Sequence, residues 1–191
     1  MSQPKQIATL PPLPVLRNDL ALSDRTGEPR RPALLVVALV LCQFAVAGVA
    51  FSYAIHWWDA VHQESYATSA RLIEWVAPDP GKWLSLTLEG VLAALAALVA
   101  GACGIAGFHA WNGWRWSRWA GLVAVGLTGV WALLTNWWAL IGLGLAVLGA
   151  AILFLPPVTA HFAAMQRFRA RAPQPYRRPA HIFYGRLPRY R

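Results

Sequence analysis

Four apolar stretches separated by polar segments dominate the sequence. They cover residues 33–55, 84–108, 117–134 and 137–155, and the first carries no charge while the second carries only Glu89. A helix of roughly 20 apolar residues crosses the hydrocarbon core of a bilayer. Only Thr135 and Asn136 separate the last two stretches, which predicts a tight antiparallel hairpin. We therefore predict an all-α membrane protein with four transmembrane helices.

The segments that flank the apolar stretches divide the chain further. Residues 1–32 form a proline-rich arm, residues 56–83 an outer loop, and residues 156–191 a basic tail rich in Arg, Pro and Tyr around a four-helix domain at 33–155. The long polar lead and the absence of a cleavage pattern favour a retained helix over a signal peptide. In the tail, the apolar spacing predicts a helix over 158–171, which either continues the fourth span past a proline kink or lies along the membrane surface.

The charges predict the orientation in the membrane. The chain is 57% hydrophobic, 13% charged and has a formal net charge of +9, whereas a soluble domain carries about 25% charged residues. Every basic residue except Arg71 and Lys82 lies in the N-terminal arm, the second loop or the tail. Because basic residues collect on the cytoplasmic side, we predict a multi-pass protein of the cell membrane with both termini extending into the cytoplasm.

The second loop, HAWNGWRWSRW at residues 109–119, combines tryptophans with arginines and has no acid. Nucleic-acid stacking, a cofactor cage and a membrane boundary are the three readings of such a segment. Tryptophan rings favour the headgroup level, where arginines reach phosphates, so the boundary is preferred. We predict lipid or partner contacts here and in the tail at Trp111, Trp114, Arg115, Trp116, Arg118, Arg167, Arg169, Arg171, Arg177 and Arg178.

The basic tail has three possible roles, namely binding anionic lipid, an acidic protein face, or RNA. No RNA-binding module accompanies its charges. We therefore predict anionic lipids and other membrane subunits as partners, and no nucleic acid.

Rows of small residues predict close helix packing. Ala93, Ala97 and Gly101 recur at spacing four in the second stretch, and Gly142, Ala146 and Ala150 do so in the fourth. Small residues let helix backbones approach each other inside a membrane. The rows suit packing within the bundle or contact with another protein.

Glu89 is the main candidate for intramembrane chemistry. An acidic residue inside a membrane span by itself suggests a functional role. Glu89 could make a structural polar contact, make a contact between subunits, or take part in transport or catalysis. A proton relay requires several titratable groups, and we expect no second acid or buried histidine beside Glu89. Structural contact is therefore the preferred reading.

The start of the outer loop, HWWDAVHQE, offers a weak metal-site candidate. In a helix, His56, Asp59 and His62 share one face. A complete zinc site requires a further ligand, and the HExxH pattern is absent; a solvated amphipathic helix is the preferred reading. No histidine lies at mid-span to ligate haem, and we predict no metal and no cofactor. Cys42 and Cys103 lie in apolar stretches, where we expect two small hydrophobic side chains and no disulfide.

The segment GWRWSRWAGL at residues 113–122 resembles a feature of many small actinobacterial membrane proteins, in which a Trp/Arg-rich cytoplasmic loop opens a helix. The wider layout is similar to that of an accessory subunit of the actinobacterial respiratory supercomplex, which joins cytochrome bcc to cytochrome c oxidase. The resemblance implies a role in assembly or stabilisation, with haem and copper carried by neighbouring subunits.

These observations predict a non-catalytic accessory subunit of a larger membrane complex, and the resemblance favours a respiratory supercomplex. Two alternatives remain open. One is a small transporter or membrane enzyme that uses Glu89, with the His56, Asp59 and His62 face as an outer site. The other is a lipid-binding membrane organiser that uses the arginine tail.

Overall fold

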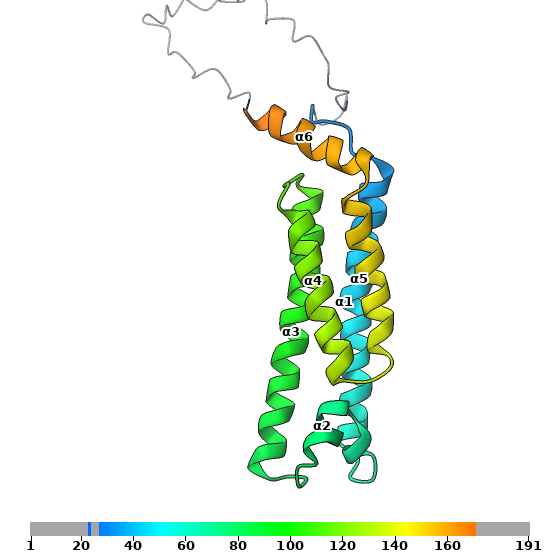
Figure 1. The fold of residues 1–191 in the computed structure, drawn as a ribbon, viewed down its shortest axis with the longest axis vertical. Coiled ribbons are helices and arrows are strands. Elements are labelled where there is room, and N and C mark those ends of the chain that lie inside the picture. Colours follow the sequence, from blue (N-terminus) through cyan, green and yellow to red (C-terminus); the bar gives the residue numbers. More distant parts are fainter. Residues whose placement is uncertain (1–22, 24–26, 171–191) are drawn as a thin grey trace, which may run out of the picture.

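The computed structural model describes Ser23 and residues 27–170, and all of their regular structure is helical. Four long helices form an elongated bundle (Figure 1). A short 3-10 helix, η1, and helix α2 lie at one end, which we call the α2 end, and helix α6 lies across the other, the α6 end. The elements are α1 (Ala33–Ala60), η1 (Tyr66–Thr68), α2 (Arg71–Val76), α3 (Trp83–Trp111), α4 (Ser117–Leu134), α5 (Ala139–Leu153) and α6 (Pro156–Ala170).

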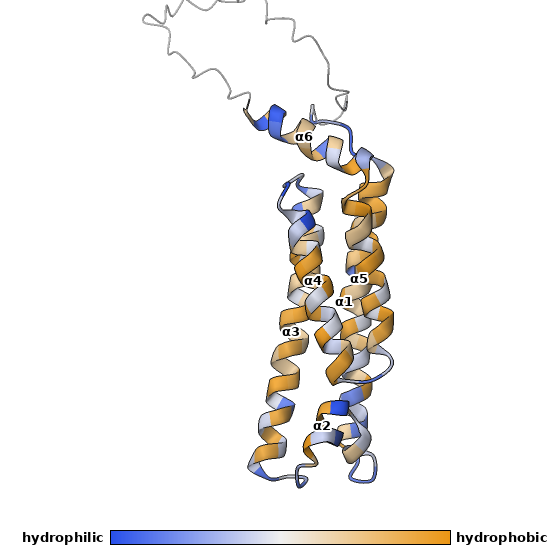
Figure 2. Cartoon of the chain, viewed as in Figure 1, coloured by the Kyte–Doolittle hydropathy of each residue, from blue (hydrophilic) through white to orange (hydrophobic). Residues whose placement is uncertain are grey.

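The predicted apolar helices are confirmed, and three of them are individually long and apolar enough to cross a membrane. These are α1, α3 and α4; α5 meets the same criterion only when it is taken together with α6, from which it is bent by 60°. Figure 2 shows hydrophobic residues along the full length of the bundle. The fold is therefore compatible with a multi-pass membrane protein, with three such helices among the described residues, or four if the bent pair is one span.

The four long helices form a ring. Helix α1 packs against α3 and α5, and α4 packs against the same two helices, so that each neighbouring pair runs antiparallel (Figure 1). Small residues bring α1 and α5 into backbone contact. A Cβ atom added to Gly48 would lie 2.8 Å from the Cα atom of Gly142, and one added to Gly149 would lie 3.2 Å from the Cys42 sulfur. The expected packing role of Gly142 is confirmed, and Cys42 and Cys103 are both buried free thiols.

Polar side chains connect opposite helices of the ring near the α2 end. The indole Nε1 of Trp131, which is fully buried, donates a hydrogen bond of 2.8 Å to Ser52 Oγ. The Asn136 amide, in the predicted hairpin between α4 and α5, donates at 2.9 Å to the Ser52 carbonyl oxygen. The short α2 joins the same hairpin, because the Arg71 backbone N–H donates to the Thr135 carbonyl oxygen at 3.1 Å. The first two bonds hold α4 and the hairpin against α1, and the third attaches the outer loop to the hairpin.

Helix α6 confirms the helix predicted in the tail. It begins at Pro156 and Pro157, which fit a first turn because those positions need no N–H donor. Val158, Phe162 and Met165 are buried against the bundle. Met165 packs on Gly113, whose φ of 72° suits glycine, and a Cβ atom there would lie 2.6 Å from Met165 Cγ. The apolar stripe of α6 is thus what holds it across the end of the bundle.

Candidate functional site

A buried histidine and a carboxylate meet between α1 and α3 near the α2 end. His56 Nε2 lies 2.9 Å from Glu89 Oε2. The His56 side chain is 0% exposed and that of Glu89 is 25% exposed. Because the two helices are antiparallel neighbours, the last turns of α1 lie beside the first turns of α3. The pair therefore joins two residues that are 33 positions apart in the sequence.

Our expectation that no buried histidine lies beside Glu89 is wrong. The first apolar stretch ends at residue 55, but α1 continues to Ala60, since a helix does not have to end where its hydropathy falls. His56 therefore lies inside the bundle. Its position could have been found from spacing, because Val49, Ser52 and His56 recur at intervals of three and four on the buried face of α1.

The weak metal-site candidate does not form a metal centre. His56 is turned to Glu89, whereas His62 is exposed and its Nδ1 donates a hydrogen bond of 2.7 Å to the Trp58 carbonyl oxygen. Asp59 accepts through its backbone carbonyl from the Ser65 hydroxyl at 2.9 Å. Within Ser23 and residues 27–170, no three His, Cys, Asp or Glu side chains are grouped to hold a metal ion.

A cavity of about 380 Å³ lies next to the pair. Its lining residues come from the end of α1, the outer loop and the start of α3: Ala60, Val61, Gln63, Tyr66, Pro80, Gly81, Ser85, Leu86 and Glu89. Two buried polar atoms in this region, His56 Nδ1 and Glu89 Oε1, have no hydrogen-bond partner within the described part of the chain. Buried polar groups are normally satisfied. The region therefore has unused capacity to bind a polar molecule.

The side chains of His56, Glu89 and Tyr66 can donate and accept protons. Burial raises the pKa of the Tyr66 phenol, a side-chain hydrogen bond with Ser85 lowers it by less, and the nearby Glu89 charge raises it slightly further, so the hydroxyl remains protonated and can donate. An imidazole and a carboxylate at hydrogen-bond distance can exchange a proton. We call His56, Glu89 and Tyr66 the outer polar cluster.

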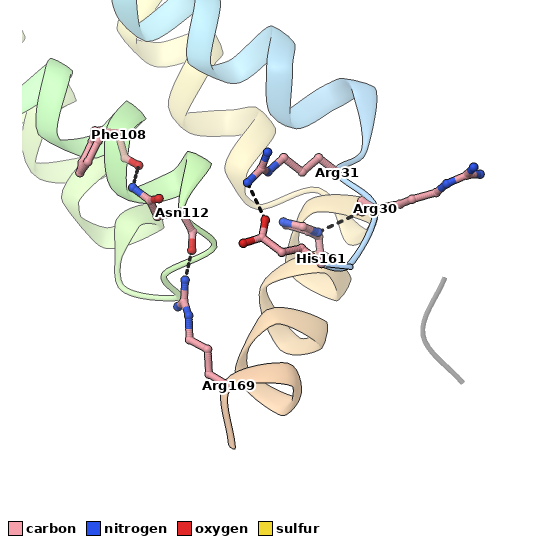
Figure 3. A network of polar contacts seen from close by, with 7 residues as sticks. Arg30, Arg31, Phe108, Asn112, His161 and Arg169 are labelled. Atoms are coloured by element: carbon pink, nitrogen blue, oxygen red, sulfur yellow. Dashed lines mark hydrogen bonds and ion pairs between the residues drawn. The ribbon is translucent and has the colours of Figure 1, made fainter. Parts of the chain in front are cut away.

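The Trp/Arg-rich connection between α3 and α4 contacts α6. The Arg169 guanidinium lies 4.4 Å from the ring centroid of Trp114, and it also donates to the Asn112 carbonyl oxygen. Arg115 Nη1 donates to Gln166 Oε1 at 3.2 Å. Figure 3 shows the arginine from α6 reaching the turn that follows α3. Part of this segment thus holds α6 in place, which its sequence did not indicate.

The remaining predicted contact residues are distributed around the same end. The Arg31 guanidinium lies 4.4 Å from the Trp111 ring centroid, and that of Arg118 lies 5.6 Å from the Trp119 ring centroid. Trp116 and Arg167 are exposed, and lipid or partner contact at these positions stays a prediction. Arg171, Arg177 and Arg178 lie outside the described residues, as does the proline-rich segment at residues 10–17.

Comparison with protein families, characterised proteins and solved structures finds no match to this chain. A functional assignment therefore depends on the chemistry and geometry of the chain itself.

Proposed function

We propose that this protein is a non-catalytic accessory subunit that stabilises or assembles a larger membrane complex. In this proposal it spans the cell membrane four times, with the α6 end and both termini in the cytoplasm. The observation that supports it is an exposed amide in the middle of α1. At about 1.5 Å per residue, Gln43 lies about 15 Å along the helix from Ala33, which is half of a hydrocarbon core roughly 30 Å thick.

Gln43 faces outward at this depth. Its side chain is exposed, and it has no hydrogen-bond partner in the part of the chain that the structure describes. An amide without a partner in hydrocarbon costs roughly 2–7 kcal/mol. Because an amide on a neighbouring helix can satisfy it, Gln43 favours a partner helix seated against α1.

The surface beside Gln43 suits such a helix. A cavity of about 260 Å³ runs between α1 and α3, lined mainly by small residues: Val49, Ala50, Tyr53, Ala93, Ala96, Ala97 and Ala100. Gly101 continues this surface, and a Cβ atom there would meet nothing within 4 Å. Gln43 lies on the same seam, since its Nε2 atom would be 3.8 Å from a Cβ atom at Gly107. We call this surface the α1–α3 groove.

The α1–α5 interface indicates how the groove would be used. There, Gly48 and Gly142 allow backbone contact between two helices of this chain. The α1–α3 groove offers the same residue types on an outer surface, together with an amide that lacks a partner. The layout of proline-rich arm, spans and Arg/Pro/Tyr tail resembles that of an accessory subunit of a respiratory supercomplex, which supports such a complex as the larger assembly.

The test is isolation of the full-length protein from its native membranes in mild detergent, followed by subunit identification. We compare Gln43→Leu and Gly101→Leu in the groove with Gly144→Leu on α5, where an added Cβ also meets nothing within 4 Å. All three variants should fold. The two groove variants should lose a partner that the wild type and Gly144→Leu retain at fixed stoichiometry.

Two results would overturn the proposal. One is a wild-type protein recovered without any reproducible partner, or only as a homodimer. The other is a partner retained equally by all three variants, which would place the interface elsewhere. A visible absorption spectrum of the isolated complex then tests whether haem-bearing subunits are present.

The outer polar cluster favours a second candidate function, a small transporter or membrane enzyme that uses Glu89. The supporting observation is the pair of Glu89 with His56 at 2.9 Å beside an open cavity. Glu89→Gln keeps the shape of the side chain and removes its charge, and Glu64→Gln, at an exposed position, is the matched control. Unchanged growth and unchanged proton or solute flux in Glu89→Gln proteoliposomes would remove this candidate.

A further inference from the structure

A third cavity, at the α6 end, is lined by three arginines and a histidine. It has a volume of about 440 Å³ and lies between the segment before α1 and the outer face of α6. Its lining residues are Pro29, Arg30, Arg31, Pro32, Pro157, Ala160, His161, Ala163, Ala164 and Arg167. No acidic side chain is among them. The Glu28 carboxylate bonds one of the three arginines, Arg31. A site that collects more guanidinium groups than carboxylates attracts an anion.

The three arginines differ in whether their guanidinium groups already contact other groups of the chain. Arg31 Nη2 donates to Glu28 Oε2 at 2.9 Å, and its guanidinium also lies over the Trp111 ring. Arg30 and Arg167 have exposed side chains without an ion pair among the described residues. Figure 3 shows the Arg30 side chain extending away from the helices. The Arg30 and Arg167 side chains are therefore exposed beside this cavity, and a ligand there would be reached by turning their guanidinium groups toward it.

His161 provides an independent observation. It is only 5% exposed, its Nδ1 donates a hydrogen bond of 3.2 Å to the Arg30 carbonyl oxygen, and its Nε2 is buried without a partner within Ser23 and residues 27–170. Protonation of the ring would turn Nε2 into a second donor. Burial lowers the pKa of His161, and the Arg31 charge adds to this, whereas the Arg30 carbonyl and Glu28 oppose it. An anion in the cavity would raise the same pKa again.

We propose that this cavity binds the phosphate group of an anionic phospholipid, with Arg30 and Arg167 as its charged ligands. Three features favour a lipid over a soluble phosphate. Prolines and alanines form an apolar wall beside the guanidinium groups, as a glycerol backbone requires. Exposed apolar side chains continue from the cavity at Val36 and Val37 on α1 and at Leu155 before α6. The exposed Trp114 and Trp116 mark the headgroup level at this end.

The site is independent of the accessory-subunit proposal, because it lies on α6 and the segment before α1, away from the α1–α3 groove. It requires only that the α6 end lies at a membrane surface. It also differs from diffuse attraction of a basic tail to anionic lipid, because it has a defined stoichiometry and depends on two particular arginines.

The test uses the purified full-length protein in mild detergent. Short-chain phosphatidylglycerol, phosphatidylcholine and inorganic phosphate are titrated separately, and bound molecules are counted by native mass spectrometry. Arg30→Gln and Arg167→Gln are compared with Arg71→Gln, which removes the same charge at the α2 end, from a guanidinium that lies over the Trp137 ring. Circular dichroism verifies that all variants fold.

We expect one phosphatidylglycerol molecule to bind to each protein, with higher affinity than phosphatidylcholine. Each cavity variant should weaken that binding by at least about fivefold, the effect of one arginine near an anionic surface, whereas Arg71→Gln should retain it. In the wild type, the His161 ring resonances should titrate at higher pH when the lipid is bound. Equal weakening in all three variants, equal binding of both lipids, or displacement of phosphatidylglycerol by inorganic phosphate at similar concentration would each overturn the proposal.

Discussion

The backbone contact between α1 and α5 makes a quantitative prediction for Gly48→Ala. The added Cβ atom would lie 2.8 Å from the Gly142 Cα atom and 3.0 Å from its backbone nitrogen, whereas ordinary contact begins at 3.4 Å. Both obstacles are backbone atoms, which no side-chain rotation can move. The two helices must therefore separate by about 0.6 Å at the crossing, the difference between 3.4 and 2.8 Å.

Overpacking of this kind costs about 1–3 kcal/mol. Replacing a helical glycine by alanine also brings a gain of up to about 1 kcal/mol from helix propensity. Gly144→Ala on α5 isolates that gain, because its Cβ atom would meet nothing within 4 Å. We expect Gly48→Ala to be less stable than Gly144→Ala by about 1–3 kcal/mol in free energy of unfolding.

The assay is reversible unfolding in mixed micelles with increasing sodium dodecyl sulfate, followed by tryptophan fluorescence and circular dichroism. Both variants are compared with the wild type under identical conditions. If Gly48→Ala unfolds at the same detergent fraction as Gly144→Ala, the close approach of α1 to α5 is refuted, because a Cβ atom at that crossing could not be accommodated without cost.

Three further predictions concern single contacts. Trp131→Phe removes the hydrogen bond to Ser52 and leaves a void in a fully buried site, so the free energy of unfolding in the same assay should fall by about 1–3 kcal/mol. Gly113→Ala places a side chain at φ 72° and against Met165, so protease cleavage of α6 should accelerate. Burial lowers the pKa of His161 from its usual 6.5; docking of α6 is then complete above about pH 6.5 and weakens below it. The protection factors of the α6 amides, in which the pH-dependent intrinsic exchange rate is divided out, should therefore be lower at pH 5 than at pH 7.5, roughly the range over which histidine titrates; equal protection factors at both values would contradict this.

Hydropathy was sufficient to predict the helices, because each apolar stretch is long enough to demand backbone hydrogen bonds within itself. It was less informative about their ends. The first helix extends beyond residue 55 to Ala60, since polar residues continue a helix readily. This error placed His56 in a loop and hid its contact with Glu89.

The contacts at the α6 end could not be predicted for a different reason. His161 and the Arg30 carbonyl are 131 positions apart, and the acceptor is a backbone atom that exists at every residue. Neither spacing nor residue type identifies such a pair. The spacing of apolar residues predicted the apolar face of α6. The bend of 60° between α5 and α6, which places α6 across the end of the bundle, follows from packing on the α3–α4 connection.

The ring of helices is closed by the first and the last of its members, since α1 packs against α5. During translation, α1 is the first of the four ring helices to be synthesised and α5 is the last. Until α5 and its preceding hairpin have been synthesised, Gly48 has no backbone to contact and the Ser52 carbonyl has no Asn136 amide. The nascent protein must therefore hold an incomplete, open arc of three helices, and translation arrested after α4 would leave the surface of α1 that contacts α5 uncovered.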